Sequence, residues 1–340
     1  MDFKALPKLE LHAHLTGSIS RQTLHEIWSR KKAAGVTDLE DPLVVMPEGK
    51  HDYNLKTFFP LFSTYIYALI TDPASVSYAT QAVLRDFAAD GVRYLELRTT
   101  PRATRSPTDG SEILSRESYV RTVLDAIASY ETGQRDPDVL RTKLILSIDR
   151  RDDLPTAMET VHLAARLRGI VETRVAYPVH FAESEASGTD EELVTLLSWR
   201  PGRLGHVIWL SDRVKELVRR RGEQGEEDEA GFRGIGLELC LSCNILAGMT
   251  RGPSAGFAGH HFGEWWGAKG CWVSLGTDDV GVFGSPLSNE YRLAAEHFNL
   301  SDAQVCELAS LGIESIFGGE EEKARLRRIM WTPERMGKMQ

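Results

Sequence analysis

Residues 9–35, LELHAHLTGSISRQTLHEIWSRKKAAG, contain a short strand pattern followed by a helix that carries both of its end signals. Residues 9–12 alternate apolar and polar side chains, a period typical of a β-strand. Ser20 is a good N-cap for a helix over residues 21–34, and Gly35 is the residue type that commonly follows a helix. This stretch therefore predicts one strand-helix unit.

The same unit recurs along the chain. Further strands rich in Val, Ile and Leu are predicted at residues 92–97, 143–148, 175–180, 204–207, 235–239 and 272–275. Helices are predicted from Pro73, capped by Asp72, to a point before Gly91, and at residues 111–131, 155–167, 190–198, 212–221 and 287–298. Strands that alternate with helices favour a parallel sheet, and so many of them favour an α/β fold of the TIM type, a (β/α) barrel, as a single domain over residues 1–340.

Composition excludes several classes of protein. The 340 residues are 42% hydrophobic and 26% charged, which is typical of a globular chain and not of a disordered one. The net charge of -9 gives no general attraction to nucleic acid or to an anionic membrane, so an anionic ligand needs a local site. Residues 1–14 lack the apolar core of a signal peptide, no stretch approaches the ~20 apolar residues of a membrane span, and four cysteines are too few for a disulfide framework. We therefore expect a cytoplasmic or nuclear protein that does not associate with membranes.

Histidines mark the ends of several predicted strands. His12 and His14 are two residues apart, so the period of a strand places both imidazoles on one face, where they could bind one metal or could be buried and hydrogen-bonded. His180 ends another strand with Glu183 three residues on, and His206 follows Gly205 at the end of the next. Each of these signals is weak alone, because single buried histidines usually have structural partners.

Two adjacent carboxylates, Asp278 and Asp279, follow the strand at residues 272–275. Carboxylates placed together repel each other unless a cation or hydrogen-bond donors compensate them. A cation explains the pair economically, whereas a turn or a helix cap is the structural alternative.

These elements, in the order His-x-His, His-x-x-Glu, Gly-His and Asp-Asp, resemble the adenosine deaminase family of zinc aminohydrolases. The resemblance runs from Leu6 to about Glu314. The segments ELHAHLTGSIS (10–20), LELRTTPR (95–102), LSIDRR (146–151) and TDDVGVFGSPLSNEY (277–291) are similar to its N6-methyl-AMP deaminase branch.

The resemblance implies one Zn²⁺ per chain with four ligands: His12, His14, His180 and Asp278. Zinc lowers the pKa of bound water, so hydroxide can attack C6 of a purine. By the same resemblance His206 orients and deprotonates this water, and Glu183 protonates ring N1, which requires a pKa raised by burial. Asp279 is implied to accept a hydrogen bond from the N7 side or from the water.

The position of Thr16 indicates the substrate. Adenosine deaminases have an acidic residue there for the ribose 5′-hydroxyl, whereas a threonine hydroxyl, with Ser18 and Ser20 nearby, can donate to a 5′-phosphate. A purine nucleotide is therefore favoured, with N6-methyl-AMP giving IMP and methylamine, and deamination of adenosine or another 6-aminopurine is the alternative. The substrate-binding residues are His14, Thr16, Ser18 and Asp279. Possible phosphate partners, which could equally be ion-paired at the surface, are Arg98, Arg102, Arg150 and Arg151.

Other conspicuous residues have simpler interpretations. Cys240 and Cys243 form a CxxC that has no second CxxC for a zinc ribbon and does not open a helix in a thioredoxin-like unit, so buried packing is expected. His260, His261 and the pair Trp265-Trp266 are assigned to packing in a helix before the last strand. The charged, glycine-rich residues 219–234 are predicted to form a solvated loop.

The 30 residues between Asp149 and His180 hold one helix and one strand, where the resembled family has two strand-helix passages. Residues 169–172 could be a remnant strand, but parallel neighbours need a crossover of about a dozen residues. One βα unit is therefore predicted to be missing or distorted, including the segment that offers a backbone N–H to purine N3. Two hypotheses follow: a working deaminase with a distorted barrel, or a catalytically silent purine-binding or scaffold protein. A monomer is expected.

Overall fold

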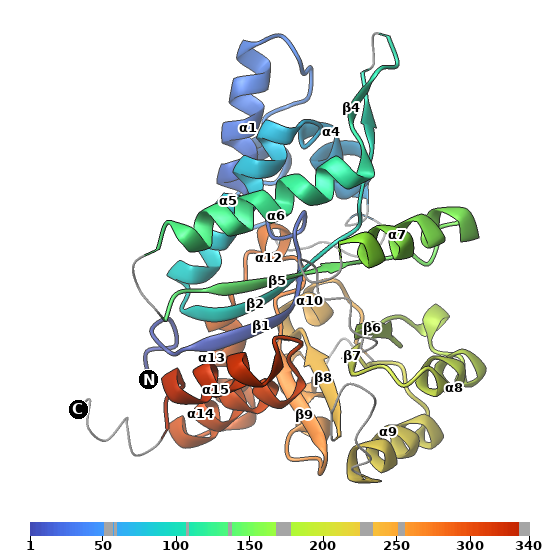
Figure 1. Cartoon of the computed structure of the whole chain (residues 1–340). Coiled ribbons are helices and arrows are strands. Elements are labelled where there is room, and N and C mark those ends of the chain that lie inside the picture. The colour runs from blue at the N-terminus through green and yellow to red at the C-terminus, as the bar shows by residue number, and fades with distance from the viewer. Residues whose placement is uncertain are drawn as a thin grey trace.

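The computed structural model describes residues 1–50, 57, 60–106, 109–134, 138–167, 178–224, 234–250 and 256–332. Its parallel strands form two arcs (Figure 1). The first arc has the order β1 (Lys8–His14), β2 (Val92–Thr99) and β5 (Arg141–Leu146). The second has the order β6 (Pro178–Phe181), β7 (Arg203–His206), β8 (Ile235–Leu239) and β9 (Cys271–Leu275). These strands lie where the apolar patterns predict them, within a few residues at each end, although residues 175–177 of the fourth lie outside the described part.

The two arcs meet where β1 runs beside the end of β9. Asp278 donates its backbone N–H to the His12 carbonyl at 2.8 Å, and the His14 N–H donates to the Asp278 carbonyl at 3.0 Å. Glu10 joins the same strand ends, because its carboxylate accepts from the backbone N–H of His12 at 2.7 Å and of Thr277 at 2.9 Å. The junction therefore brings the histidine motif of β1 beside the aspartate pair that follows β9.

At the other ends of the arcs, β5 pairs only with β2 and β6 only with β7 among the described residues, and these two end strands are not paired with each other. Between them the same residues hold one helix, α7 (Leu154–Arg166). The prediction that one βα unit is missing between Asp149 and His180 agrees with this arrangement, and residues 169–172, the possible remnant strand, lie outside the description. Strand number, tilt and shear are coupled in a closed barrel, and in the described part of the chain no strand joins β5 to β6.

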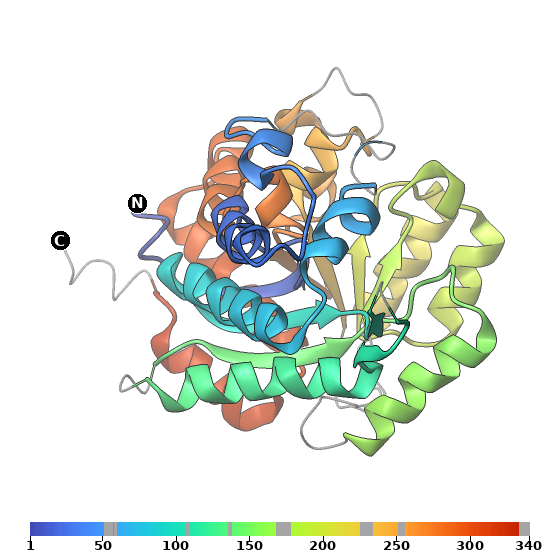
Figure 2. The ribbon, with the colours of Figure 1, turned by 90° about the horizontal axis from the view of Figure 1, so that it is seen from above.

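Helices surround the strands (Figure 2). The longer ones are α1 (Arg21–Ala33), α5 (Pro73–Ala89), α6 (Arg116–Thr132), α8 (Asp190–Ser198), α9 (Asp212–Gln224), α13 (Leu287–Phe298), α14 (Asp302–Leu311) and α15 (Gly319–Ile329). The short ones are α2 (Pro42–Val45), α4 (Tyr67–Leu69), α10 (Leu241–Leu246), α11 (Phe262–Trp265) and α12 (Val280–Phe283). The predicted caps are confirmed, since Ser20 accepts from the Thr23 N–H at 3.2 Å and Asp72 forms a capping box with Ser75.

Two predicted boundaries are wrong. The helix predicted from residue 111 begins at Arg116, because the preceding residues form β4 (Glu112–Leu114), which pairs antiparallel with β3 (Thr104–Arg105), and Ser115 caps the helix. The loop predicted from residue 219 starts too early, because α9 continues to Gln224. Residues 225–233 lie outside the described part.

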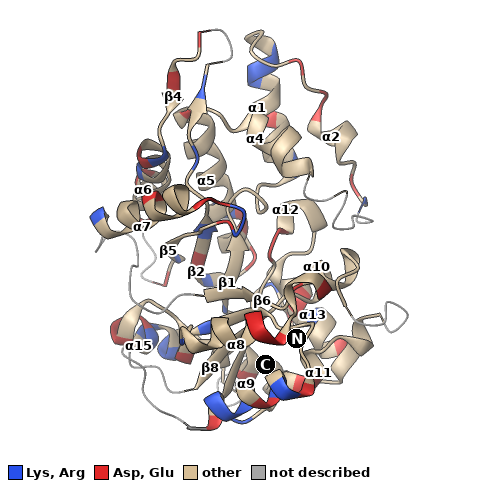
Figure 3. Ribbon diagram, turned by 90° about the vertical axis from the view of Figure 1, so that its right-hand side faces the viewer, with Lys and Arg blue, Asp and Glu red and all other residues tan. Residues whose placement is uncertain are grey.

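The outer helices carry charges of both signs, as Figure 3 shows for α6 and α15. Arg121 pairs with Glu117 one turn away on α6, and Arg325 pairs with Glu322 on α15. In the described part of the chain, none of the helices combines the length and the apolar character that a bilayer crossing requires.

Candidate metal centre and active site

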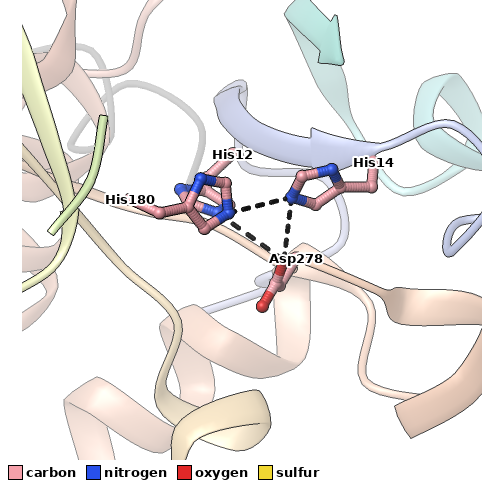
Figure 4. Close-up of side chains that lie close together, drawn as sticks. All are labelled: His12, His14, His180 and Asp278. Carbon is pink, nitrogen blue, oxygen red and sulfur yellow. Dashed lines mark hydrogen bonds and ion pairs between the residues drawn. The ribbon is translucent and has the colours of Figure 1, made fainter. Parts of the chain in front are cut away.

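His12 and His14 lie together because β1 places both side chains on the inner side of the sheet. His12 Nε2 is 3.6 Å and His14 Nε2 is 3.3 Å from Asp278 Oδ1 (Figure 4). His180 reaches the same point from β6, with its Nε2 3.1 Å from that of His14. His180 is exposed on β6, which is the end strand of the second arc in the described part of the chain, and its ring lies against those of His12 and His14. The structure thus brings the four predicted metal ligands together.

One ligand atom from each of these four side chains lies within 4.8 Å of all the others. Three imidazole nitrogens and one carboxylate oxygen form a donor set that suits Zn²⁺. His12 Nε2 is buried and has no hydrogen-bond partner among the described residues. Burial lowers the pKa of His14 to about 4, which keeps this imidazole neutral and its lone pair available. The residues therefore fit a metal ion.

A buried carboxylate, that of Glu238, holds the His12 ring on the side away from the ligand cluster. The His12 Nδ1–H donates to Glu238 Oε2 at 2.7 Å, which leaves Nε2 free to face the ligand cluster. Burial opposes ionisation of Glu238, but the guanidinium groups of Arg98 and Arg203 hold its pKa well below its usual range. Arg98 also donates to the Leu11 carbonyl at 2.9 Å. Arg98 is thus committed to orienting His12 and does not serve as a phosphate partner.

His206, at the end of β7, is fixed by its neighbours in a left-handed backbone conformation, with φ at 68°. Asn244 hydrogen-bonds its Nδ1 at 3.0 Å and in turn contacts His260 Nε2 at 3.2 Å, while His261 Nε2 donates to the His206 carbonyl at 2.5 Å. Gly205 is required here, because a Cβ at that position would lie 2.6 Å from His12 Cε1. The assignment of His260 and His261 to helix packing is therefore wrong: both precede α11 and position His206.

Two side chains face the open side of the ligand cluster. His206 Nε2 is 3.8 Å from Glu183 Oε1 and 3.9 Å from Asp278 Oδ2, and it has no hydrogen-bond partner among the described residues. Burial lowers the pKa of His206 to about 3, so the ring is a neutral base. Burial, together with the charge of Asp278, raises the pKa of Glu183 to about 7. A neutral base and an acid that keeps its proton up to about pH 7 therefore lie side by side.

Asp279 follows Asp278 directly, is buried, and has its carboxyl against Gly17. Burial and the charges of Asp278 and Glu183 raise the pKa of Asp279 well above its usual range, and its Oδ1 has no partner among the described residues. A protonated carboxyl donates a hydrogen bond, which differs from the acceptor role that the resemblance implied.

A second group of polar side chains continues from β1. The Tyr67 hydroxyl hydrogen-bonds Thr16, and the Arg102 guanidinium carbon lies 3.9 Å from the centre of the Tyr67 ring. Arg102 Nη2 is buried without a partner among the described residues, as is the hydroxyl of Ser18. The Ser20 hydroxyl caps α1 by accepting from the Thr23 N–H, so it is engaged in the helix cap. The remaining candidates are paired at the surface, Arg150 with Glu192 and Arg151 with Asp149.

The CxxC motif follows β8. Cys240 is the N-cap of the short helix α10, so the motif does stand at a helix start, although the expectation concerned a helix of a thioredoxin-like unit. Both cysteines are free and buried, as expected, but Cys243 also donates its thiol to Asp278 Oδ2 at 2.9 Å. The motif therefore lies in the wall of the site.

The adenosine deaminase family model matches residues 7–188 and 228–332. The chain belongs to the adenosine deaminase family. A human relative, N6-methyl-AMP deaminase, is 33% identical over 356 residues, which cover 96% of this chain and 93% of the relative. The structure of Arabidopsis ADAL complexed with GMP has a TM-score of 0.81 and 31% identity, and covers 98% of this chain and 99% of its own. The structure of Arabidopsis ADAL complexed with IMP has a TM-score of 0.80 and 31% identity, with 96% of each chain covered.

The sequence-based interpretation of this family member missed the residues that hold the ligands in place: Glu10, Arg98, Arg203, Glu238, Asn244, His260 and His261. Most are single charged or polar residues inside apolar strands, such as Glu10 and Glu238. A charge in a buried strand needs a partner, and this is the signal that could have identified them.

Proposed function

We propose that this family member is a zinc-dependent deaminase that converts N6-methyl-AMP and water into IMP and methylamine. The observation that carries the proposal is the cluster of His12, His14, His180 and Asp278 beside a neutral base, His206, and a protonated acid, Glu183. Zinc, when bound, lowers the pKa of a coordinated water and so supplies a nucleophile at neutral pH.

The side chains of this chain carry the proton transfers. His206 Nε2 orients the attacking water and accepts its proton, because this atom is neutral and has no competing partner among the described residues. Glu183 gives its proton to ring N1 as oxygen adds to C6. Asp279 donates a hydrogen bond to N7. The C6–N6 bond then breaks as methylamine leaves with the proton held by His206, and the proton of the C6 hydroxyl passes to Glu183, so that C6 becomes the carbonyl of IMP and both side chains return to their starting states.

The 5′-phosphate is assigned to Thr16, Ser18 and Arg102. The Ser18 hydroxyl and Arg102 Nη2 are buried donors without a partner among the described residues. Stacking on Tyr67 fixes the plane of the Arg102 guanidinium. The hydroxyl of the same tyrosine is hydrogen-bonded to the side chain of Thr16. A planar guanidinium suits a phosphate better than a neutral 5′-hydroxyl. This arrangement favours a nucleotide over adenosine, the alternative substrate.

A second candidate function, purine binding without turnover, is favoured by the lack of pairing between β5 and β6 among the described residues. An end strand gives the ligand His180 less support than a strand with neighbours on both sides.

The test is incubation of the purified, zinc-loaded protein with N6-methyl-AMP, AMP and adenosine, with IMP and inosine detected by mass spectrometry. IMP formed fastest from N6-methyl-AMP supports the proposal. Product from adenosine alone would overturn the substrate assignment. Tight nucleotide binding with no product from any of the three would instead favour the silent, purine-binding alternative.

A further inference from the structure

The two oxygens of Asp278 face two different groups of donors. Oδ1 lies 3.6 Å and 3.3 Å from the Nε2 atoms of His12 and His14. Oδ2 faces the opposite group, with Cys243 Sγ at 2.9 Å and His206 Nε2 at 3.9 Å. A carboxylate arranged in this way can bridge two cations, one on each oxygen.

The second group contains a set of metal donors of its own. A ligand atom from each of His206, Cys240 and Asp278 lies within 4.8 Å of the other two, and all three side chains are buried. His206 Nε2, which is buried and without a hydrogen-bond partner among the described residues, points to a missing ligand at this position. Thus the cluster does not rest on the cysteine alone.

The donor types define the cation. An imidazole nitrogen, a carboxylate oxygen and a thiolate sulfur together suit Zn²⁺ and softer divalent ions such as Cd²⁺, and they suit Mg²⁺ and Ca²⁺ poorly. The first group, which has no sulfur among its four donors, lacks this preference for soft ions.

We propose that His206, Cys240 and Asp278 form a second, thiophilic cation site that shares Asp278 with the first. Binding replaces the Cys240 S–H bond with a sulfur–metal bond and releases one proton to solvent. The cation also occupies His206 Nε2, so it inhibits deamination. This consequence for activity rests on the proposed function, whereas cation binding itself does not.

The experiment starts from protein loaded with one equivalent of Zn²⁺ and adds Cd²⁺. Bound zinc and cadmium are counted by elemental mass spectrometry, and the ultraviolet charge-transfer band of a cadmium–thiolate bond is recorded. Native protein is expected to take up one Cd²⁺ while retaining its zinc, with the band and with release of one proton. No cadmium uptake, or exchange of zinc for cadmium without the band, overturns the proposal.

Two variants identify the sulfur ligand. Cys240→Ser is expected to lose the band and to bind Cd²⁺ at least about tenfold more weakly. Cys306→Ala, which removes a buried thiol on α14 that belongs to none of the ligand groups, is the control and is expected to behave like native protein. A band that survives in Cys240→Ser overturns the assignment. If Cys240→Ser fails to fold, cadmium NMR of the native protein replaces it, and a resonance without thiolate character overturns the proposal.

Activity separates this inference from the proposed function. Inhibition by Cd²⁺ that a chelator reverses, in protein that deaminates with zinc alone, supports both. Cadmium uptake with the thiolate band in protein that deaminates none of the three purines supports the second site and contradicts the proposed function. Active protein that binds no second cation contradicts the second site only.

Discussion

The carboxyl group of Asp279 occupies the space where a side chain on residue 17 would begin. A Cβ built on Gly17 would lie 1.4 Å from Asp279 Oδ1 and 2.4 Å from its Cγ. Gly17 follows Thr16 just after β1, and Asp279 follows β9, so this contact depends on the junction of the two arcs. Only a glycine at position 17 therefore leaves room for the carboxyl group of Asp279 at this place.

Gly17→Ala is expected to displace Asp279 and to lower kcat by about 10²-fold or more, the scale of losing one positioned hydrogen-bond donor from an active site. Zinc content should remain near one per chain, because the atoms nearest to a Cβ at position 17 all belong to Asp279 and none to the four ligands. The measurement is steady-state kinetics together with metal analysis. Gly133→Ala, in the cap of α6 with its nearest non-neighbour atom at 3.3 Å, is the control. Full activity in Gly17→Ala would show that the position of Asp279 is unimportant.

Glu183→Gln is expected to retain zinc and to lower kcat by roughly 10²–10⁴-fold, because the amide has the shape of the acid but cannot protonate N1. Metal analysis and kcat on N6-methyl-AMP are the two readouts. Glu192→Gln, on the exposed helix α8, serves as the matched control. Near-normal turnover in Glu183→Gln would remove Glu183 from its assigned role.

The pH dependence of kcat/KM follows from the same group. Burial raises the pKa of Glu183 to about 7, and the protonated form is the active one. Activity is therefore present below pH 7 and is lost as the pH rises through it, in proportion to the protonated fraction. Rates measured from pH 5.5 to 9 (about 1.5 to 2 units either side of the pKa) give the profile. A rate that is constant over this range would contradict the assignment.

Asp278→Asn is expected to weaken zinc binding by more than the 10–100-fold typical of residues that only orient ligands. Asparagine tolerates the left-handed backbone of this residue, with φ at 58°, so the variant tests the lost charge rather than backbone strain. Asp278→Ala should lose zinc as well. Metal affinity is measured by competition with a chelator, and an unchanged affinity in both variants would rule out Asp278 as a ligand.

Arg102→Ala is expected to raise KM for N6-methyl-AMP by about 10–100-fold, the loss of a hydrogen bond to a charged group, with little effect on any turnover of adenosine. Arg105→Ala, on the exposed strand β3 nearby, is the control. Kinetics on both substrates provide the comparison. An equal rise in KM for nucleotide and nucleoside would mean that Arg102 does not bind the phosphate.

Local sequence was enough to predict most of the fold. Strand β8 and helices α8 and α13 have the predicted bounds, because their periodicity and end residues are local properties. The start of α6 was wrong for a tertiary reason. Residues 112–114 pair with β3, a contact that a propensity for helix does not reveal.

The sequence by itself determined which residues can bind a metal and move protons, because the spacing of His12 and His14 on a strand and the adjacency of Asp278 and Asp279 are properties of the chain. Only the tertiary structure decided which groups support them. Glu238 and Arg98 are 140 residues apart yet share one ion pair, and Cys243 reaches Asp278 from α10, the helix that follows β8. Such partners meet because parallel strands end at a common edge, and that depends on the order of strands in space. For the same reason, the shortened segment before His180 was visible in the sequence, while only the structure showed that β5 and β6 do not pair with each other among the described residues.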